Sequence, residues 1–288
     1  MTKKQFPRTI VAGLSLPRMI IGTNWMLGYG HRTPSADGLI RARNYNKDAI
    51  ADIICNFLEF DIDAIMGPMG GNQCLVDGIR LAEDRAGKKV TIIDTPIINV
   101  DDNEAARREA HATIKKSREI GSAFCLPHHS SVEQLVNKNI SAMPRLPDYL
   151  KMIRDAGMIP GLSAHMPELI VYSDAQGYDV ETYVQIYNCL GYMMQVEIEY
   201  IHSIIWKAKK PVMTIKALAA GRVTPFVGLS FSFATLRECD MVTVGCFHPD
   251  EVYEDVEIGL AAIERRYPNL GGRSSPNKTA ALGGSIKV

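Results

Sequence analysis

The sequence predicts a (β/α)8 barrel, a fold in which eight parallel strands close on themselves inside a ring of helices. Short apolar runs alternate with helical patterns along the chain, which is typical of parallel sheets. The segment 210–262 shows this most clearly, because two apolar runs each stop at small residues and lead into a helix. The length of 288 residues also suits one barrel of about 250 residues. An open doubly wound sheet is the alternative, but no Gly-x-Gly-x-x-Gly motif follows the first strand.

The predicted strands are short apolar runs, several of them rich in β-branched residues, that end at polar or small residues. In chain order they are Met19–Gly22, Ala64–Met66, Lys89–Ile93, Ala123–Leu126, Met158–Leu162, Tyr183–Tyr187, Pro211–Ile215 and Met241–Val244.

Each run is followed by a stretch with helical periodicity. Asp48–Phe60, for example, places Ile50, Ile54 and Phe57 on one side, and Gly87 and Gly121 are plausible stops for the next two helices. The predicted helices are Asp48–Phe60, Asn72–Ala86, Glu104–Glu119, Pro147–Ala156, a short one within Pro167–Gly177, Glu197–Lys209, Pro225–Arg237 and Asp250–Arg265.

Two segments fall outside this alternation. Thr23–Asn46 is rich in Gly, Arg and Asn and is expected to be a loop. Residues 269–288 are rich in glycine and serine, and we expect a flexible tail there. The chain is therefore predicted to be a single barrel domain over residues 1–268 followed by that tail.

Composition narrows the classes of function. Lys+Arg and Asp+Glu both number 32, so the formal net charge is zero and charge gives no support for nucleic-acid or membrane-surface binding. The six cysteines form no Cys-x-x-Cys pair, and reduced thiols are expected. Neither a signal peptide at Met1–Arg8 nor an apolar run of ~18 residues is evident, so we expect a cytoplasmic protein. Apolar residues at 192–194 and 204–206 serve either a homo-oligomer interface or core packing.

In a barrel of this kind the active site lies at the C-terminal ends of the strands. His128 and His129 follow the fourth predicted strand, where a histidine can act as general acid or base. Asp94 ends the third, and His165 follows the fifth. Two imidazoles and a carboxylate could bind a metal, but no His-x-Glu or His-x-x-x-His spacing is present, so we expect no metal.

Lys216 is the single lysine at the end of a predicted strand. A lysine desolvated in a barrel can form a Schiff base with a carbonyl substrate, or it can pair with an anionic group of the substrate. A structural salt bridge across the mouth is the other interpretation.

Gly221, Arg222 and Gly245 follow the last two strands. Loops at these positions often bind phosphate through backbone N–H groups, and an arginine adds a bidentate contact to an anion. The polar loop that contains His31, Arg32, Arg41 and Arg43 is either a cover for an anionic substrate or a solvated loop.

Several segments together resemble the aldo/keto reductase superfamily. They are Leu16-Pro-Arg-Met-Ile-Ile-Gly-Thr, Phe124-Cys-Leu-Pro-His-His, Gly157-Met-Ile-Pro-Gly-Leu-Ser, Val184-Gln-Ile-Tyr-Asn, Lys210-Pro-Val-Met-Thr-Ile-Lys-Ala-Leu-Ala-Ala-Gly and Val244-Gly-Cys-Phe-His-Pro-Asp-Glu-Val. The resemblance implies a barrel oxidoreductase that uses NADP or NAD, with Ser163 and Gln185 at the positions that hold the carboxamide of the nicotinamide.

The family's catalytic tetrad of Asp, Tyr, Lys and His is largely missing. Its tyrosine position falls near Met69, its aspartate position near Ala64 beside Asp63, and its lysine position near Asp94. Only the histidine has a match, at His128 or His129. Because methionine cannot donate a proton, the resemblance implies a barrel with a divergent active site.

Three hypotheses about function follow. The first is an oxidoreductase that acts on a small carbonyl or sugar-like compound, with His128 or His129 as acid/base, Lys216 or Arg222 holding an anionic group, and the nicotinamide cofactor bound by Ser163, Gln185, Gly221, Arg222 and Gly245. The second is a lyase, aldolase or isomerase in which Lys216 forms the Schiff base. The third is a barrel that binds a ligand without catalysis.

Overall fold

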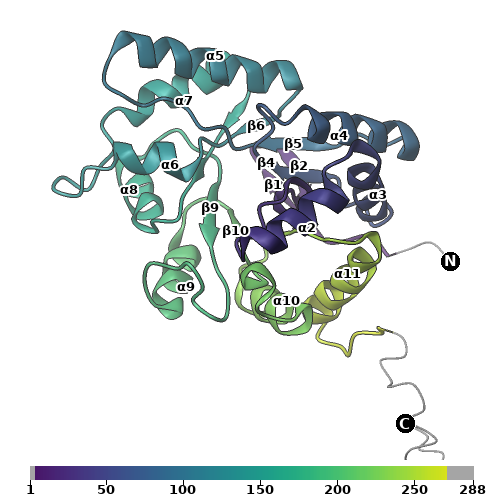
Figure 1. The fold of residues 1–288 in the computed structure, drawn as a ribbon. Helices are drawn as coiled ribbons and strands as arrows, with labels where there is room; N and C mark the ends of the chain where they lie inside the picture. Colours follow the sequence, from purple (N-terminus) through teal and green to yellow (C-terminus); the bar gives the residue numbers. More distant parts are fainter. Residues whose placement is uncertain (1–3, 271–288) are drawn as a thin grey trace, which may run out of the picture.

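The computed structural model describes residues 4–270, in which nine strands form one sheet of parallel neighbours in the order β7-β6-β5-β4-β3-β11-β10-β9-β8. Helices surround these strands in Figure 1. The strands are β3 (Met19–Gly22), β4 (Ala64–Gly67), β5 (Thr91–Asp94), β6 (Phe124–Cys125), β7 (Ile159–Pro160), β8 (Leu162–Ser163), β9 (Tyr183–Ile186), β10 (Val212–Ile215) and β11 (Met241–Val244).

The two ends of this sheet meet at Gly161, which alone separates β7 from β8. Phe124 of β6 pairs with Ile159 on one side, and Leu162 pairs with Tyr183 of β9 on the other. A Cβ atom on Gly161 would lie 2.7 Å from the carbonyl oxygen of Thr182, so only glycine permits this approach. Because β7 and β8 together occupy the position of the predicted fifth strand, the eight-stranded barrel is confirmed.

The predicted helices are also present, with ends shifted by one or two residues. They are α3 (Lys47–Leu58), α4 (Gln73–Ala86), α5 (Glu104–Ile120), α7 (Leu146–Asp155), α8 (Glu168–Gln176), α9 (Ile198–Lys207), α10 (Pro225–Thr235) and α11 (Pro249–Glu264). Asn46 and Asn103 cap α3 and α5, since each side chain accepts a hydrogen bond from the first turn.

Two structured segments were not predicted. Residues before the barrel form an antiparallel hairpin, β1 (Arg8–Val11) and β2 (Leu14–Pro17). Val11 and Leu16 of this hairpin join the apolar cluster inside the barrel, which includes Ile20, Phe124 and Met213. The hairpin therefore contributes to the core that fills the barrel interior.

The expectation of a loop over 23–46 was wrong, because this segment contains α1 (Asn24–Leu27) and α2 (Pro34–Asn44). Thr33 accepts a hydrogen bond from the N–H of Ala36, and Pro34 occupies the first helical position. In Figure 1, α2 lies in front of the strands. A short helix, α6 (His129–Val132), also follows β6.

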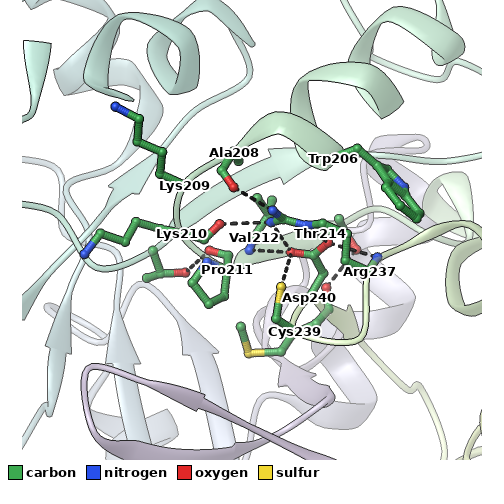
Figure 2. A network of polar contacts seen from close by, with 12 residues as sticks. Trp206, Ala208, Lys209, Lys210, Pro211, Val212, Thr214, Arg237, Cys239 and Asp240 are labelled. Atoms are coloured by element: carbon green, nitrogen blue, oxygen red, sulfur yellow. Dashed lines mark hydrogen bonds and ion pairs between the residues drawn. The ribbon is translucent and has the colours of Figure 1, made fainter. Parts of the chain in front are cut away.

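A buried ion pair joins the strands at the opposite end from the mouth (Figure 2). The Arg237 guanidinium donates to both carboxylate oxygens of Asp240, at 2.9 and 2.7 Å, and to the carbonyls of Ala208 and Lys210. Asp240 also accepts the backbone N–H groups of Val212, the first residue of β10, and of Arg237. Arg18, just before β3, donates to the carbonyls of Arg237 and Asp240. The network thus connects the beginnings of β3, β10 and β11.

Among residues 4–270, no helix combines the length and apolar composition needed to cross a bilayer. Apart from Asn269 and Leu270, the expected tail lies outside the described residues.

Candidate active site at the barrel mouth

Three histidines meet at the C-terminal end of the barrel. His128 and His129 follow β6, and His165 follows β8. The rings of His128 and His129 have centroids 4.1 Å apart, and those of His129 and His165 stack at 3.7 Å with 17° between their planes. The structure therefore brings together the three histidines that the sequence placed at separate strand ends.

Glu133 contacts the loops that carry the three histidines, and it was not among the predicted site residues. One carboxylate oxygen accepts the backbone N–H groups of His165 and Met166 at 2.7 and 2.8 Å. The other lies 3.8 Å from Nδ1 of His129. Burial alone would raise the pKa of Glu133, but the neighbouring His129 and the hydrogen bonds from the two backbone N–H groups lower it overall. The i,i+4 spacing of His129 and Glu133 was the available signal.

His128 and His165 are neutral at neutral pH. Burial, assisted by the neighbouring His129, lowers the pKa of each of these two side chains to about 4. Nδ1 of His128 lies 2.8 Å from the hydroxyl of Ser130. Both imidazoles are therefore uncharged and can accept a hydrogen bond or a proton from a substrate, with the low basicity that a pKa of about 4 gives them.

Lys216 directly follows β10 and is half-buried, with a backbone φ of 63°. No carboxylate oxygen of residues 4–270 lies within 4 Å of its ammonium group, so the expected alternative of a salt bridge across the mouth is not observed there. Burial lowers its pKa to about 8. Burial is the main cause that lowers the pKa of His31, His128 and His165, and the charge of Lys216 adds to the effect at each.

Asp94 is fully buried and its carboxylate is committed to structural contacts. One oxygen accepts the N–H of Met69 at 2.9 Å, and the other accepts the hydroxyl of Ser117 on α5 at 2.6 Å. Burial raises the pKa of Asp94. Within 4–270, no group of His, Cys, Asp and Glu has a geometry that could hold a metal ion.

Ser163 and Gln185 are both buried. The Gln185 amide nitrogen lies 3.3 Å from the carbonyl oxygen of His165. Its side-chain oxygen is buried and has no hydrogen-bond partner in the described part of the chain. A buried acceptor without a donor is costly, so this oxygen is a source of instability among the described residues.

The segment that contains α1 and α2 lies against the predicted phosphate-side residues. The Trp25 ring would be 3.6 Å from a Cβ on Gly221 and 3.5 Å from one on Gly245. Arg222 stacks on the ring of Tyr192 at 4.2 Å and donates to the carbonyl of His31. Asn44 holds the segment in place, because it donates to the carbonyls of Trp25 and Phe247. A dinucleotide that runs over both glycines would meet the Trp25 indole.

Among the comparisons with known proteins, only the comparison of structures gives matches. No family model matches the chain, and no curated protein matches it. PA4992 of Pseudomonas aeruginosa, whose assignment as an aldo-keto reductase is provisional, aligns with a TM-score of 0.65 at 15% identity over 91% of this chain and 98% of its own.

Two further structures support the same fold. An aldo/keto reductase of Klebsiella pneumoniae in complex with NADP and acetate aligns with a TM-score of 0.53 at 14% identity, over 94% of this chain and 98% of its own. A truncated 3-deoxy-D-arabino-heptulosonate 7-phosphate synthase of Thermotoga maritima also gives a TM-score of 0.53, at 9% identity over 98% and 95%. The chain therefore has the closed parallel barrel fold that is found in aldo-keto reductases and in other barrel enzymes.

Proposed function

We propose that this chain is an enzyme that acts on a small carbonyl compound at the barrel mouth, with Lys216 as the nucleophile that forms a Schiff base. The observation that carries the proposal is the half-buried ammonium group of Lys216, which has no carboxylate partner within 4–270. With a pKa of about 8, about a fifth of Lys216 is neutral at pH 7.4, against about a thousandth for an ordinary lysine. Neutral amine is the form that attacks a carbonyl.

Formation of the Schiff base proceeds through bond changes and proton transfers at the carbonyl group of the substrate. The Nζ lone pair attacks the carbonyl carbon, the C=O π electrons move to the oxygen, and a proton passes from Nζ to that oxygen to give a carbinolamine. A second proton, which comes from solvent, reaches the same oxygen; the C–O bond then breaks, water leaves, and the nitrogen lone pair forms a protonated imine. The imine can accept the electron pair of a neighbouring C–H or C–C bond when that bond breaks.

The histidine cluster supplies the proton transfers in this proposal. His128 and His165 are neutral bases at neutral pH, because their pKa values lie at about 4. His129 lies between their rings, within reach of the Glu133 carboxylate, and can relay a proton between them. Lyases, aldolases and isomerases that form a Schiff base through a lysine use this sequence of steps.

The test is trapping with borohydride, which reduces an imine to a stable amine. Incubation with small aldehydes and ketones and then borohydride is expected to add the mass of one reduced substrate to the peptide that contains Lys216. Lys216→Met should abolish the adduct. Lys210→Met is the matched control, since Lys210 pairs with Glu181 and should not be modified. An adduct that survives in Lys216→Met, or none with any carbonyl compound, contradicts the proposal.

Carbonyl reduction with a nicotinamide cofactor is the second candidate. It is favoured by the partnerless side-chain oxygen of Gln185, which suits the amide N–H of a nicotinamide, and by the NADP bound to the Klebsiella pneumoniae structure. In that case Ser163 and Gln185 would hold the carboxamide, and the cofactor would supply the hydride. Titration with NADPH tests this, because ~100-fold excess over the dissociation constant should add ~2.7 kcal/mol of stability. No shift at millimolar NADPH or NADH would remove this candidate.

A further inference from the structure

Two arginines at the barrel mouth, Arg32 and Arg222, lack the carboxylate partner that many cationic side chains of residues 4–270 have. Arg85, Arg107, Arg154 and Arg266, for example, each pair with a carboxylate. Arg32 and Arg222 have no carboxylate within 4 Å among residues 4–270, although acidic and basic residues are equal in number in the whole chain. Arg118 and Arg265 also lack such a partner among these residues, so what distinguishes Arg32 and Arg222 is that both lie at one turn of the barrel mouth.

The two guanidinium groups lie around one turn. A Cβ on Gly221 would be 3.8 Å from Nη1 of Arg32, and Arg222 is the next residue in the chain. Arg222 is also held over the Tyr192 ring and donates to the carbonyl of His31, the neighbour of Arg32, at 3.4 Å. Its remaining polar contact is with the carbonyl of Ala219 at 3.2 Å. Stacking and weak carbonyl contacts orient Arg222 without neutralising it.

The turn between Lys216 and Arg222 has a strained backbone. Ala219 and Ala220 both have positive φ values, 47° and 56°, and Lys216 has 63°. Each left-handed non-glycine residue costs about 1–2 kcal/mol, and such strain persists where the surrounding structure imposes it. Lys216 and Arg222 are therefore held at the two ends of one rigid turn.

We propose that Arg32 and Arg222 bind a phosphate group, and that the carbonyl substrate of Lys216 is a phosphorylated small molecule. The substrate assignment rests on the proposed function, whereas phosphate binding does not. A phosphate monoester carries up to two negative charges and three acceptor oxygens, which match two guanidinium groups that lack a counter-charge. Its carbonyl end would then face Lys216 at the start of the same turn.

Phosphate binding is tested with the fluorescence of Trp25, whose ring lies against Gly221. The chain has two tryptophans, so Trp206→Phe leaves Trp25 as the single reporter. Titration with inorganic phosphate at constant ionic strength is expected to change this signal with saturation. Arg32→Gln and Arg222→Gln should each weaken binding by about tenfold or more. Arg118→Gln, an exposed arginine near the end of α5, is the matched control and should leave binding unchanged.

A signal that does not saturate, or equal weakening in Arg118→Gln, overturns the phosphate site. The source of the phosphate group is settled by competition with a phosphorylated aldehyde and with NADPH and NADH. Displacement of inorganic phosphate by the aldehyde supports the substrate assignment, and displacement by NADPH alone overturns it in favour of the cofactor.

Borohydride trapping separates this inference from the proposed function. The preference of Lys216 for a phosphorylated over an unphosphorylated aldehyde should fall by about tenfold in Arg222→Gln. Phosphate binding without any trapping would refute the Schiff-base function and leave the phosphate site. Trapping without phosphate binding would leave the function and refute the site.

Discussion

At the scale of single residues, Asp255 should make the stability of the protein depend on pH. It is 3% exposed on α11, and one of its oxygens has no partner within the described residues. The other oxygen lies 3.5 Å from the thiol of Cys246. Burial raises the pKa of Asp255 to about 7 from its usual 3.8. Asp255 is therefore protonated in the folded protein at pH 5 and ionised in the unfolded chain.

The sign of the effect follows from this difference. The stabilisation is complete below pH 3.8 and is lost as pH rises through about 7, because the unfolded chain releases the proton first. The free energy of unfolding should fall over this range by up to about 4 kcal/mol. Asp255→Asn should flatten this dependence and be more stable than the wild type at pH 8. Urea unfolding from pH 5 to pH 8 measures the free energy of unfolding of both proteins. Parallel pH profiles for the wild type and Asp255→Asn would contradict the assignment of this pH dependence to Asp255.

Some site residues could be predicted from the sequence because they lie next to strand ends. His128, His129, His165 and Lys216 all follow apolar runs, and barrel geometry places such residues at one mouth. The pairing of Glu133 with backbone of another loop, and the position of Arg32 beside Gly221, depend on contacts between distant segments. A sequence pattern contains no information about such contacts. For Asp94 the strand end was right, but its carboxylate bonds to Met69 and Ser117.

At the scale of elements, the sequence predicted strands and helices wherever a local pattern was strong. The strand β3 has its predicted bounds, Met19–Gly22. The helix α2 was missed because its residues are mostly polar and show no apolar periodicity, although Thr33 and Pro34 form a recognisable start. The hairpin of β1 and β2 was missed because its strands are only partly buried. Both errors concern elements whose stability comes from packing on the barrel rather than from their own pattern.

Gly161 is the element-scale feature whose replacement should be most costly. A Cβ there would lie 2.7 Å from the Thr182 carbonyl and 2.8 Å from the Leu126 side chain, where β7 passes into β8. Gly161→Ala is expected to lower the free energy of unfolding by about 1–3 kcal/mol, since neither backbone nor core can yield freely.

The matched control is Gly38→Ala in the middle of α2, where a Cβ would meet nothing within 4 Å. That change should stabilise by about 1 kcal/mol through helix propensity. Denaturant unfolding compares the two variants, and a Gly161→Ala protein as stable as the wild type would show that the barrel does not close tightly there.

At the scale of the whole molecule, the fold could be predicted because one local pattern recurs eight times and only a few architectures accommodate it. Closure could not be read from the sequence, since it depends on β7 and β8 pairing with strands on opposite sides. Closure also brings β3 next to β11, the first and last strands of the barrel. The integrity of the barrel therefore depends on contacts between the two ends of the chain.

The network of Arg18, Arg237 and Asp240 makes such a contact, and we expect it to be critical for stability. Figure 2 shows the pair of Arg237 and Asp240. The Asp240 side chain is completely buried and Arg237 is 17% exposed. Replacing Arg237 by methionine leaves the Asp240 carboxylate buried with two backbone N–H donors but no paired cation, and removes the donors to Ala208 and Lys210. Removal of one partner from a buried ion pair costs about 3–5 kcal/mol.

Lys151→Met provides the comparison, because Lys151 and Asp155 form a pair on α7 in which both side chains are well exposed. Loss of that pair should cost less than about 1 kcal/mol. Urea unfolding of both variants, followed by far-UV circular dichroism and by tryptophan fluorescence, gives the two free energies. Equal losses would show that the buried network adds nothing beyond a surface pair. A large loss in Arg237→Met with coincident transitions by both probes would show that the two ends of the chain unfold as one barrel, because the residues that the network joins belong to its first and last strands.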